Sequence, residues 1–219
     1  MQLHIDTLTT PYLKQSLGYS DYHLVMSRSK YSAFLTHLQF FSTATTPPRL
    51  TILSALRAGL QLGLNLPVAV ILSISLRLLY APFPYIWLPI NVDQIPHSRH
   101  RSQLTCASLP AGKSNYTCSD LLQLLSASEN GGGILKRAID QGHIIGFWTM
   151  AANARTHMVS RDDVERFQQG DWQRPVVARR RGRRDDILPL WRGGPIWVSG
   201  HSWAVKKLTD VRVYEIKQQ

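Results

Sequence analysis

Cysteine and acidic residues are scarce in this sequence, and each shortage narrows the classes of protein to which it can belong. Two cysteines among 219 residues are too few for a disulfide-built scaffold, which favours a reducing compartment and predicts a cytoplasmic protein. Only 14 Asp and Glu stand against 25 Lys and Arg, so the formal net charge is +11. A chain with this excess is attracted to polyanions, either nucleic acid or an anionic membrane surface.

Recognisable catalytic patterns are missing as well. The chain has no phosphate-binding loop, no paired-carboxylate pattern and no nucleophile motif, and its acidic residues are scattered or placed where they cap helices. Its first residues, MQLHIDTLTTPYLKQ, lack the basic and apolar regions of a secretory signal. Because the catalytic patterns are missing, we expect a protein that is not an enzyme and needs no cofactor.

A long uncharged stretch raises the question of a membrane span. The chain has no charge between Arg57 and Arg77, so a transmembrane helix over residues 58–76 is one alternative. Asn65 and Pro67 fall near the middle of this stretch, and polar residues at the centre of a span disfavour insertion. We expect two soluble helices here and no membrane contact.

Hydrophobic residues make up 44% of the chain, enough for a core over most of its length. Residues 1–48 are expected to be an N-terminal helical segment with a helix over 29–41, followed by a Ser/Thr/Pro-rich loop over 42–48. Four apolar side chains at helical spacing predict the buried face of this helix: Phe34, Leu35, Leu38 and Phe41.

Residues 49–110 are expected to form an apolar helical hairpin, over 51–64 and 67–80, followed by a polar linker. Asn65 would cap the second helix, and Pro67 would lie in its first turn. Apolar side chains at helical spacing predict one buried stripe on each helix: Leu53, Leu56, Leu60 and Leu64 on the first, and Pro67, Ile71, Ile74 and Leu78 on the second.

The weak metal-ligand candidates of the chain lie in this linker and shortly after it. His97 and His100, together with Cys106 and Cys118, offer nitrogen and sulfur donors of the kind that zinc binds. Their spacing is irregular, and Cys118 falls within an expected helix. Unrelated surface histidines and buried cysteines are therefore the favoured interpretation, and no metal is expected.

Residues 111–170 combine helix caps, leucines and glycines in an order typical of a small DNA-binding module. Thr117 or Ser119 can cap a first helix, and residues 126–133 read as a turn because three consecutive glycines disfavour helix. The first helix has an apolar face with three leucines: Leu121, Leu124 and Leu125.

A second helix is expected over residues 134–141. Its basic side carries Lys136 and Arg137, and Gly142 is placed to end it in a left-handed conformation. The opposite side of this helix is apolar and would face the core.

A hairpin and a capped helix are expected to complete this module. Residues 145–150 and 157–159 read as the two strands of the hairpin, with Arg155 near its tip. Ser160 and Asp163 then match a capping pattern that starts the last helix. The apolar residues of that helix are Val164 and Phe167.

This order of elements resembles the winged helix-turn-helix of the excisionase and MerR-like group. Those domains have a Tyr-Thr start, a leucine-rich first helix, an arginine-bearing second helix ending in glycine, a wing, and a last helix that begins Ser-Arg-Asp-Asp-Val. A similar module occurs in transposition target-selection proteins of the TniQ/TnsD type. The resemblance is confined to residues 116–168.

The resemblance implies that the second helix enters the major groove of DNA while the wing follows the backbone or the minor groove. It places Lys136 and Arg137 near the groove and Arg155 on the wing, and Arg161, in the cap of the last helix, is counted with them as nucleic-acid-binding. A copy of this module that binds a protein partner instead of reading DNA bases remains an alternative.

Residues 171–219 are expected to be an arginine-rich arm and a small β-meander. Five arginines occupy six positions: Arg179, Arg180, Arg181, Arg183 and Arg184. We expect this run to stay outside any core and to contact nucleic-acid phosphates; a solvated linker paired with Asp185 and Asp186 is the alternative. The runs PIWVSG, SWAVKKL and DVRVYEIK alternate like strands, with the tryptophans of this region as the core of the meander: Trp191, Trp197 and Trp203.

The sequence thus predicts a mainly α fold with small β, made of a helical N-terminal half, a winged helix-turn-helix and a short C-terminal β-meander. The expected function is that of a non-catalytic, nucleoid-associated DNA-binding accessory protein of a mobile genetic element. It would act in excision, integration or target selection within a larger nucleoprotein assembly, with double-stranded DNA and proteins as partners. A structural RNA- or protein-binding subunit of a ribonucleoprotein is the alternative, and a membrane-anchored basic protein the second.

Overall fold

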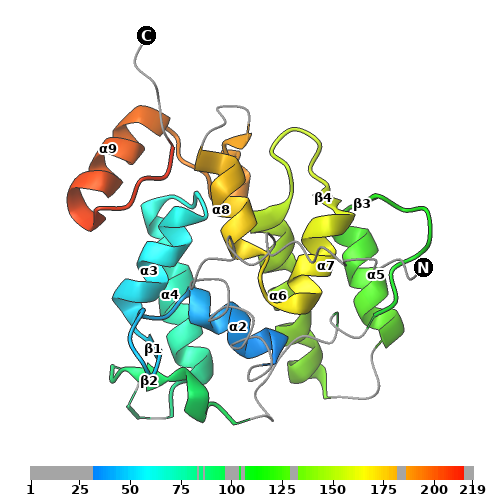
Figure 1. The fold of residues 1–219 in the computed structure, drawn as a ribbon, viewed down its shortest axis with the longest axis horizontal. Coiled ribbons are helices and arrows are strands. Elements are labelled where there is room, and N and C mark those ends of the chain that lie inside the picture. Colours follow the sequence, from blue (N-terminus) through cyan, green and yellow to red (C-terminus); the bar gives the residue numbers. More distant parts are fainter. Residues whose placement is uncertain are drawn as a thin grey trace, which may run out of the picture. The chain divides into compact units, whose positions relative to one another are not determined.

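In the computed structural model of the chain, the residues described below belong, from Ala33 onward, to one compact unit. The structure describes the following residues: 32–82, 84–85, 87–96, 104, 107–128, 133–181 and 186–214. Within them the fold is mainly helical, with short antiparallel strand pairs (Figure 1). The expectation of a mainly α fold with small β is confirmed at this level.

The first described helix, α2 (Ala33–Phe40), lies at the centre of this unit. Its four predicted core residues are all buried: Phe34, Leu35, Leu38 and Phe41. A loop then leads to strand β1 (Arg49–Leu50), which pairs antiparallel with β2 (Ile90–Asn91). A single 3-10 turn, η1 (Val92–Gln94), follows β2.

The predicted helical hairpin is confirmed as α3 (Ile52–Gln61) and α4 (Leu66–Tyr80). Asn65 caps α4 by accepting a hydrogen bond from the Val68 N–H at 2.9 Å, with a proline in the first turn. The two helices pack closely, because a Cβ added at Gly59 would lie 3.3 Å from the Cβ of Ala69. No helix in the described part of the chain is long and apolar enough to cross a membrane.

The buried stripe predicted for α4 is wrong. Ile71, Ile74 and Leu78 are 63%, 43% and 60% exposed, and the inner face of α4 is instead the following set: Ala69, Ser73, Arg77 and Tyr80. Small residues on this face let α4 approach α3, and the Arg77 guanidinium donates to the carbonyl of Leu50 at 2.7 Å. Of the stripe predicted for the first helix, Leu60 and Leu64 (the latter just beyond α3) are buried, whereas Leu56 is half-buried and Leu53 is 51% exposed.

The expected DNA-binding segment folds as β3 (Asn115–Tyr116), α5 (Cys118–Ser128), α6 (Ile134–Ala151), β4 (Val159–Ser160) and α7 (Arg161–Gln169). Two predicted caps are confirmed. Thr117 and Asp120 each accept a hydrogen bond from the other's backbone N–H at the start of α5, and Ser160 accepts one from the Asp163 N–H at 3.1 Å. The predicted core residues of α7, Val164 and Phe167, are fully buried.

The predicted wing hairpin is wrong. The second helix does not end at Gly142: α6 continues to Ala151 and includes the residues expected to form the first strand. Val159 pairs with Tyr116 of β3, not with that strand. The reason is the period of the apolar residues, because burial of Ile144, Phe147 and Met150 on one face of a continuous helix outweighs the weak helix propensity of one glycine.

The predicted C-terminal β-meander is wrong too. After α8 (Gln173–Arg181), a 3-10 turn, η5 (Leu190–Arg192), leads to α9 (Val198–Thr209), which contains the whole SWAVKKL run. Val211, Val213 and Tyr214 are buried, yet the Tyr214 hydroxyl donates to the Gly63 carbonyl beyond α3 and not to a neighbouring strand. The tryptophans expected in a meander core are 64%, 73% and 65% exposed: Trp191, Trp197 and Trp203.

Candidate nucleic-acid interface

The first turn of α6 presents two of the expected DNA-binding residues to solvent. Arg137 is exposed and Lys136 half-buried. The N-cap is Gly133, so no side chain caps this end, and its first turn holds no acidic residue. Ile134 and Leu135 in the same turn are 90% and 75% exposed. The backbone N–H groups of a helix start, the positive end of the helix dipole and two cations together favour an anion here.

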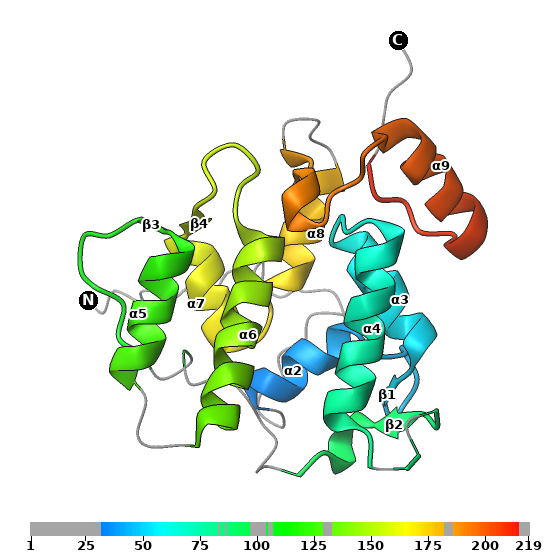
Figure 2. The same ribbon diagram turned by 180° about the vertical axis from the view of Figure 1, so that it is seen from behind.

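Arg155 lies at the other end of the same helix. It is exposed, in the turn that follows α6, where its backbone N–H donates to the Asn153 side chain at 2.8 Å. Because a helix rises 1.5 Å per residue, about 20 Å of α6 separates Arg137 from Ala151. The two ends of α6 can be followed in Figure 2. The structure therefore does not bring Arg155 together with Lys136 and Arg137.

Arg161 makes contacts within the protein. At the start of α7 its Nε donates to Glu165 at 2.8 Å, one turn further along the helix. Its Nη1 donates to the carbonyl of Pro110 at 2.8 Å. The guanidinium therefore ties the loop before β3 to α7.

The arginine run does not form a free arm. Arg179, Arg180 and Arg181 belong to the last turn of α8. Arg179 pairs with Asp163 at 2.7 Å and Asp186 at 3.0 Å. Burial opposes its charge, but these two carboxylates outweigh burial and raise the pKa of Arg179.

Arg180 is only 1% exposed and donates to the carbonyl of Leu62 at the end of α3. Burial lowers the pKa of Arg180 to about 10. The expectation that no core can absorb this run is wrong for Arg179 and Arg180, because successive residues of a helix point in directions about 100° apart and cannot all face solvent. Arg181 is exposed, and Arg183 and Arg184 lie outside the described residues.

Sequence reasoning missed a buried arginine whose guanidinium contacts several backbone carbonyls. Arg192, only 2% exposed, donates to four carbonyls at the end of α6. They are those of Trp148 at 3.3 Å, Thr149 at 2.7 Å, Ala152 at 2.6 Å and Asn153 at 3.0 Å. The Trp148 and Asn153 carbonyls also accept the backbone N–H groups of Ala152 and His157, so Arg192 matters most for the carbonyls of Thr149 and Ala152. Burial lowers the pKa of Arg192 to about 10. Some 40 residues separate it from these carbonyls, so no local pattern could reveal the contact.

Asp186 joins these cations into one structural network. Its carboxylate, 2% exposed, accepts from Arg179 and from the backbone N–H of Ala154 at 3.1 Å. The network connects the end of α6 with α7 and α8. Among the described residues expected to bind nucleic acid, four are exposed or half-buried and lie outside this network and the Arg161 contacts: Lys136, Arg137, Arg155 and Arg181.

The zinc candidates are not brought together among the described residues. His97, His100 and Cys106 lie outside them, and Cys118 is the first residue of α5 with a free thiol. Burial raises the pKa of Cys118. In the described part of the chain, no cluster of three or more His, Cys, Asp or Glu could hold a metal ion.

Comparison of the chain with protein-family models, curated proteins and solved structures found no match.

Proposed function

We propose that the protein is a non-catalytic DNA-binding accessory factor that contacts the backbone of double-stranded DNA through the first turn of α6. The observation that carries the proposal is the placement of Lys136 and Arg137 at a helix start with a glycine cap and no acidic residue. Phosphate is the anion that such a helix end accommodates best. The chain's net charge of +11 adds long-range attraction to the same partner.

The order of elements supports this proposal. The β3–α5–α6–β4–α7 succession, closed by the pairing of Tyr116 with Val159, is compatible with the resemblance to the winged helix-turn-helix group. In helix-turn-helix proteins the N-terminal residues of the second helix reach the major groove, and Lys136 and Arg137 occupy that position on α6. Without the expected hairpin, contact with the DNA backbone is favoured over extensive base reading.

Exposed apolar side chains support a role of the protein within a larger assembly. A contiguous exposed apolar patch often marks an interaction surface, whereas a scattered exposed apolar residue does not. Ile71, Ile74 and Leu78 expose one face of α4, and Trp203 and Leu208 of α9 are 65% and 72% exposed. Excision, integration or target selection in a mobile element is the setting that the resemblance suggests for such an assembly.

The test is a fluorescence-anisotropy titration of a labelled 30-base-pair duplex at several salt concentrations. The double variant Lys136→Ala/Arg137→Ala should bind at least about 10-fold more weakly than the wild type. The slope of log K against log salt is negative and should become shallower by about 2, since each lost phosphate contact removes roughly 0.9 from its magnitude. Arg155→Ala/Arg181→Ala is the matched control, because it removes the same charge at other positions and should change binding less.

Equal losses in the two double variants would show that net charge alone drives binding and would contradict the proposed contact. Unchanged binding in Lys136→Ala/Arg137→Ala would contradict it as well. The same titration with a structured RNA separates the alternative, because tighter binding of RNA that survives both double variants would favour a ribonucleoprotein subunit.

A further inference from the structure

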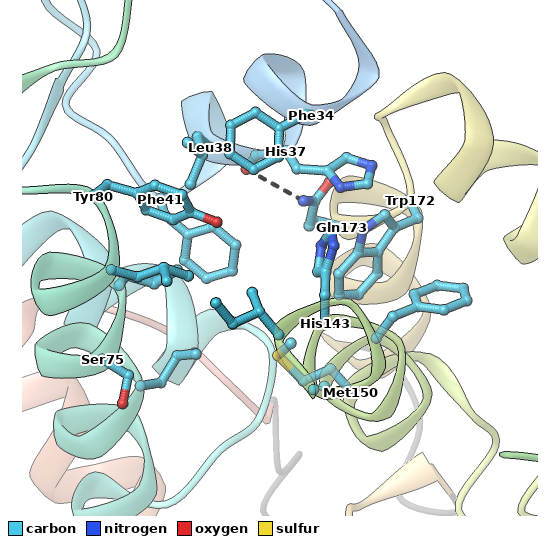
Figure 3. A pocket seen from close by; sticks show the side chains of 17 residues that line it. Phe34, His37, Leu38, Phe41, Ser75, Tyr80, His143, Met150, Trp172 and Gln173 are labelled. Atoms are coloured by element: carbon cyan, nitrogen blue, oxygen red, sulfur yellow. Dashed lines mark hydrogen bonds between the residues drawn. The ribbon is translucent and has the colours of Figure 1, made fainter. Parts of the chain in front are cut away.

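A cavity of about 360 Å³ opens between α2, α4, α6 and the start of α8. Most of its wall is aliphatic or aromatic, and Figure 3 shows these side chains converging from the surrounding helices. None of the described lining residues is Lys, Arg, Asp or Glu. The cavity is within the range of small-molecule sites, roughly 300–1,000 Å³, and a buried apolar cavity of about 150 Å³ already holds benzene.

One side of the cavity is polar. His37, His143, Trp172 and Gln173 lie there, with the imidazole of His37 beside the other three side chains in Figure 3. The centroids of the His37 and His143 rings are 5.7 Å apart, and those of His37 and Trp172 are 6.5 Å apart. Gln173 donates to the His37 carbonyl at 3.3 Å, which leaves the His37 ring for other partners.

The hydrogen-bond roles of the His37 ring follow from the hydrogen bond that it makes within the described part of the chain. Its Nε2 lies 2.9 Å from the Phe167 carbonyl, and because a carbonyl oxygen only accepts, Nε2 carries the proton. Burial, and then the neighbouring His143, lower the pKa of His37 to about 3. The ring is therefore neutral at pH 7, and its Nδ1 is a hydrogen-bond acceptor.

Two buried polar atoms at this end of the cavity lack partners among the described residues. They are Nδ1 of His37 and Nε1 of Trp172, in residues that are 4% and 2% exposed. Buried polar atoms are nearly always hydrogen-bonded, so an unmatched pair in two residues that also line the cavity indicates a missing group. One atom accepts and the other donates, which is the pattern that a single hydroxyl group satisfies.

We propose that this cavity binds a small neutral molecule with an apolar body and one hydroxyl group, which donates to His37 Nδ1 and accepts from the Trp172 N–H. The apolar body lies against α4 and α6, where leucines of α4 and Met150 of α6 line the wall. A charged ligand is disfavoured because no described lining side chain could neutralise it. This site does not depend on DNA binding, since none of its described residues belongs to the first turn of α6.

Isothermal titration calorimetry on the full chain at pH 7.5 tests the ligand chemistry. The probes are 2-naphthol, naphthalene, which lacks the hydroxyl group, and 2-naphthoate, which replaces it with a charge. 2-Naphthol should bind at least about 10-fold more tightly than naphthalene, and 2-naphthoate should bind more weakly than 2-naphthol. Trp172→Phe keeps an aromatic ring but removes the donor, so it should weaken 2-naphthol about 10-fold and leave naphthalene unchanged.

A cavity-filling variant tests the place of binding. Gly146 lines the cavity, and a Cβ added there would meet nothing closer than the Met150 Cε at 4.0 Å. Gly146→Leu should fill the cavity and abolish 2-naphthol binding, whereas Gly146→Ala gains helix propensity without filling it and should still bind. Melting temperatures of all variants verify folding.

Absence of binding by the wild type would overturn the inference, as would equal affinities for 2-naphthol and naphthalene. Undiminished binding to Gly146→Leu would place the ligand elsewhere and overturn it too. The duplex titration on the same variants keeps the two proposals separate, because the DNA affinity of Gly146→Leu should equal that of the wild type.

Discussion

At the scale of single residues, buried arginines donate hydrogen bonds to backbone carbonyls of other segments, two of them at the ends of helices. Arg77 donates to the Leu50 carbonyl, Arg180 to the Leu62 carbonyl and Arg192 to four carbonyls around the end of α6. A guanidinium presents five donors in a fixed plane, which suits the several unpaired carbonyls at a helix C-terminus. In this protein a large basic excess therefore serves the fold as well as any polyanionic partner.

Replacement of Arg192 should be strongly destabilising. In Arg192→Met the carbonyls of Thr149 and Ala152 lose the guanidinium donor, and we expect the free energy of unfolding to fall by about 3 kcal/mol. Arg192→Lys should lose less, because one ammonium can reach some of these carbonyls but not all. Urea unfolding at pH 7.5 measures both. Arg181→Met, on the exposed end of α8, is the control and should stay within about 0.5 kcal/mol of the wild type; an equal loss there would contradict the capping role.

At the scale of elements, the backbone at two glycines distinguishes the interior of one helix from the end of another. Gly142 lies inside α6, and a Cβ added there would meet no atom within 4 Å. Gly170 ends α7 with a φ of 91°, and its Cβ would lie 2.7 Å from the Ala33 carbonyl oxygen of α2. Only the second position requires glycine.

The substitution of alanine at each glycine should therefore have opposite effects. Gly142→Ala should stabilise the protein by about 0.5–1 kcal/mol through helix propensity. Gly170→Ala should destabilise it by more than about 1 kcal/mol, because the residue would need both a left-handed backbone and space that α2 occupies. Thermal and urea unfolding measure both changes. A destabilised Gly142→Ala variant would instead indicate that the second helix ends at Gly142 with a left-handed residue.

At the scale of the whole molecule, His37 and His143 lie where distant parts of the chain meet. His37 of α2 contacts Phe167 of α7, which is 130 residues away, and both histidines pack against its ring. Burial lowers the pKa of His143 to about 4, and burial followed by the neighbouring His143 lowers that of His37 to about 3. The folded core therefore requires both imidazoles to be neutral.

Stability should fall as the medium becomes acidic. Unfolded imidazoles titrate near pH 6.5 and these folded ones near 3 and 4, so between these values the unfolded state binds more protons. The contribution is fully present above about pH 6.5 and decreases towards pH 4, by about 1.4 kcal/mol per pH unit for each proton.

Urea unfolding at pH 7.5, 6.0 and 5.0 measures this dependence, above the range in which ordinary carboxyl groups titrate. His37→Gln, which keeps a donor for the Phe167 carbonyl, should lose only part of the slope, because burial also lowers the pKa of His143 and of His201. His157→Asn, at an exposed position with a φ of 55°, should retain all of it. A wild-type stability that does not change between pH 7.5 and 5.0 would contradict the neutral buried pair.

The sequence alone determined where several helices begin. The caps of α4, α5 and α7 at Asn65, Thr117 and Ser160 were predictable because a cap is a contact between a side chain and a backbone N–H about three residues away. The helical spacing of apolar residues in α2 and the acid-rich start of α7 were predictable on the same local grounds. Such signals need no knowledge of what packs against the helix.

Tertiary structure alone decided which faces are buried, where α6 ends and what the arginines contact. Whether Ile71 or Ala69 of α4 faces the core depends on how closely α3 approaches. The burial of Arg180 depends on the Leu62 carbonyl, which is 118 residues away in the sequence. Likewise, α6 passes Gly142 because its far end gains buried contacts and receives Arg192 as a cap. A sequence pattern expresses the preference of a segment, whereas these outcomes depend on the free energy of contacts with partners that only the folded chain supplies.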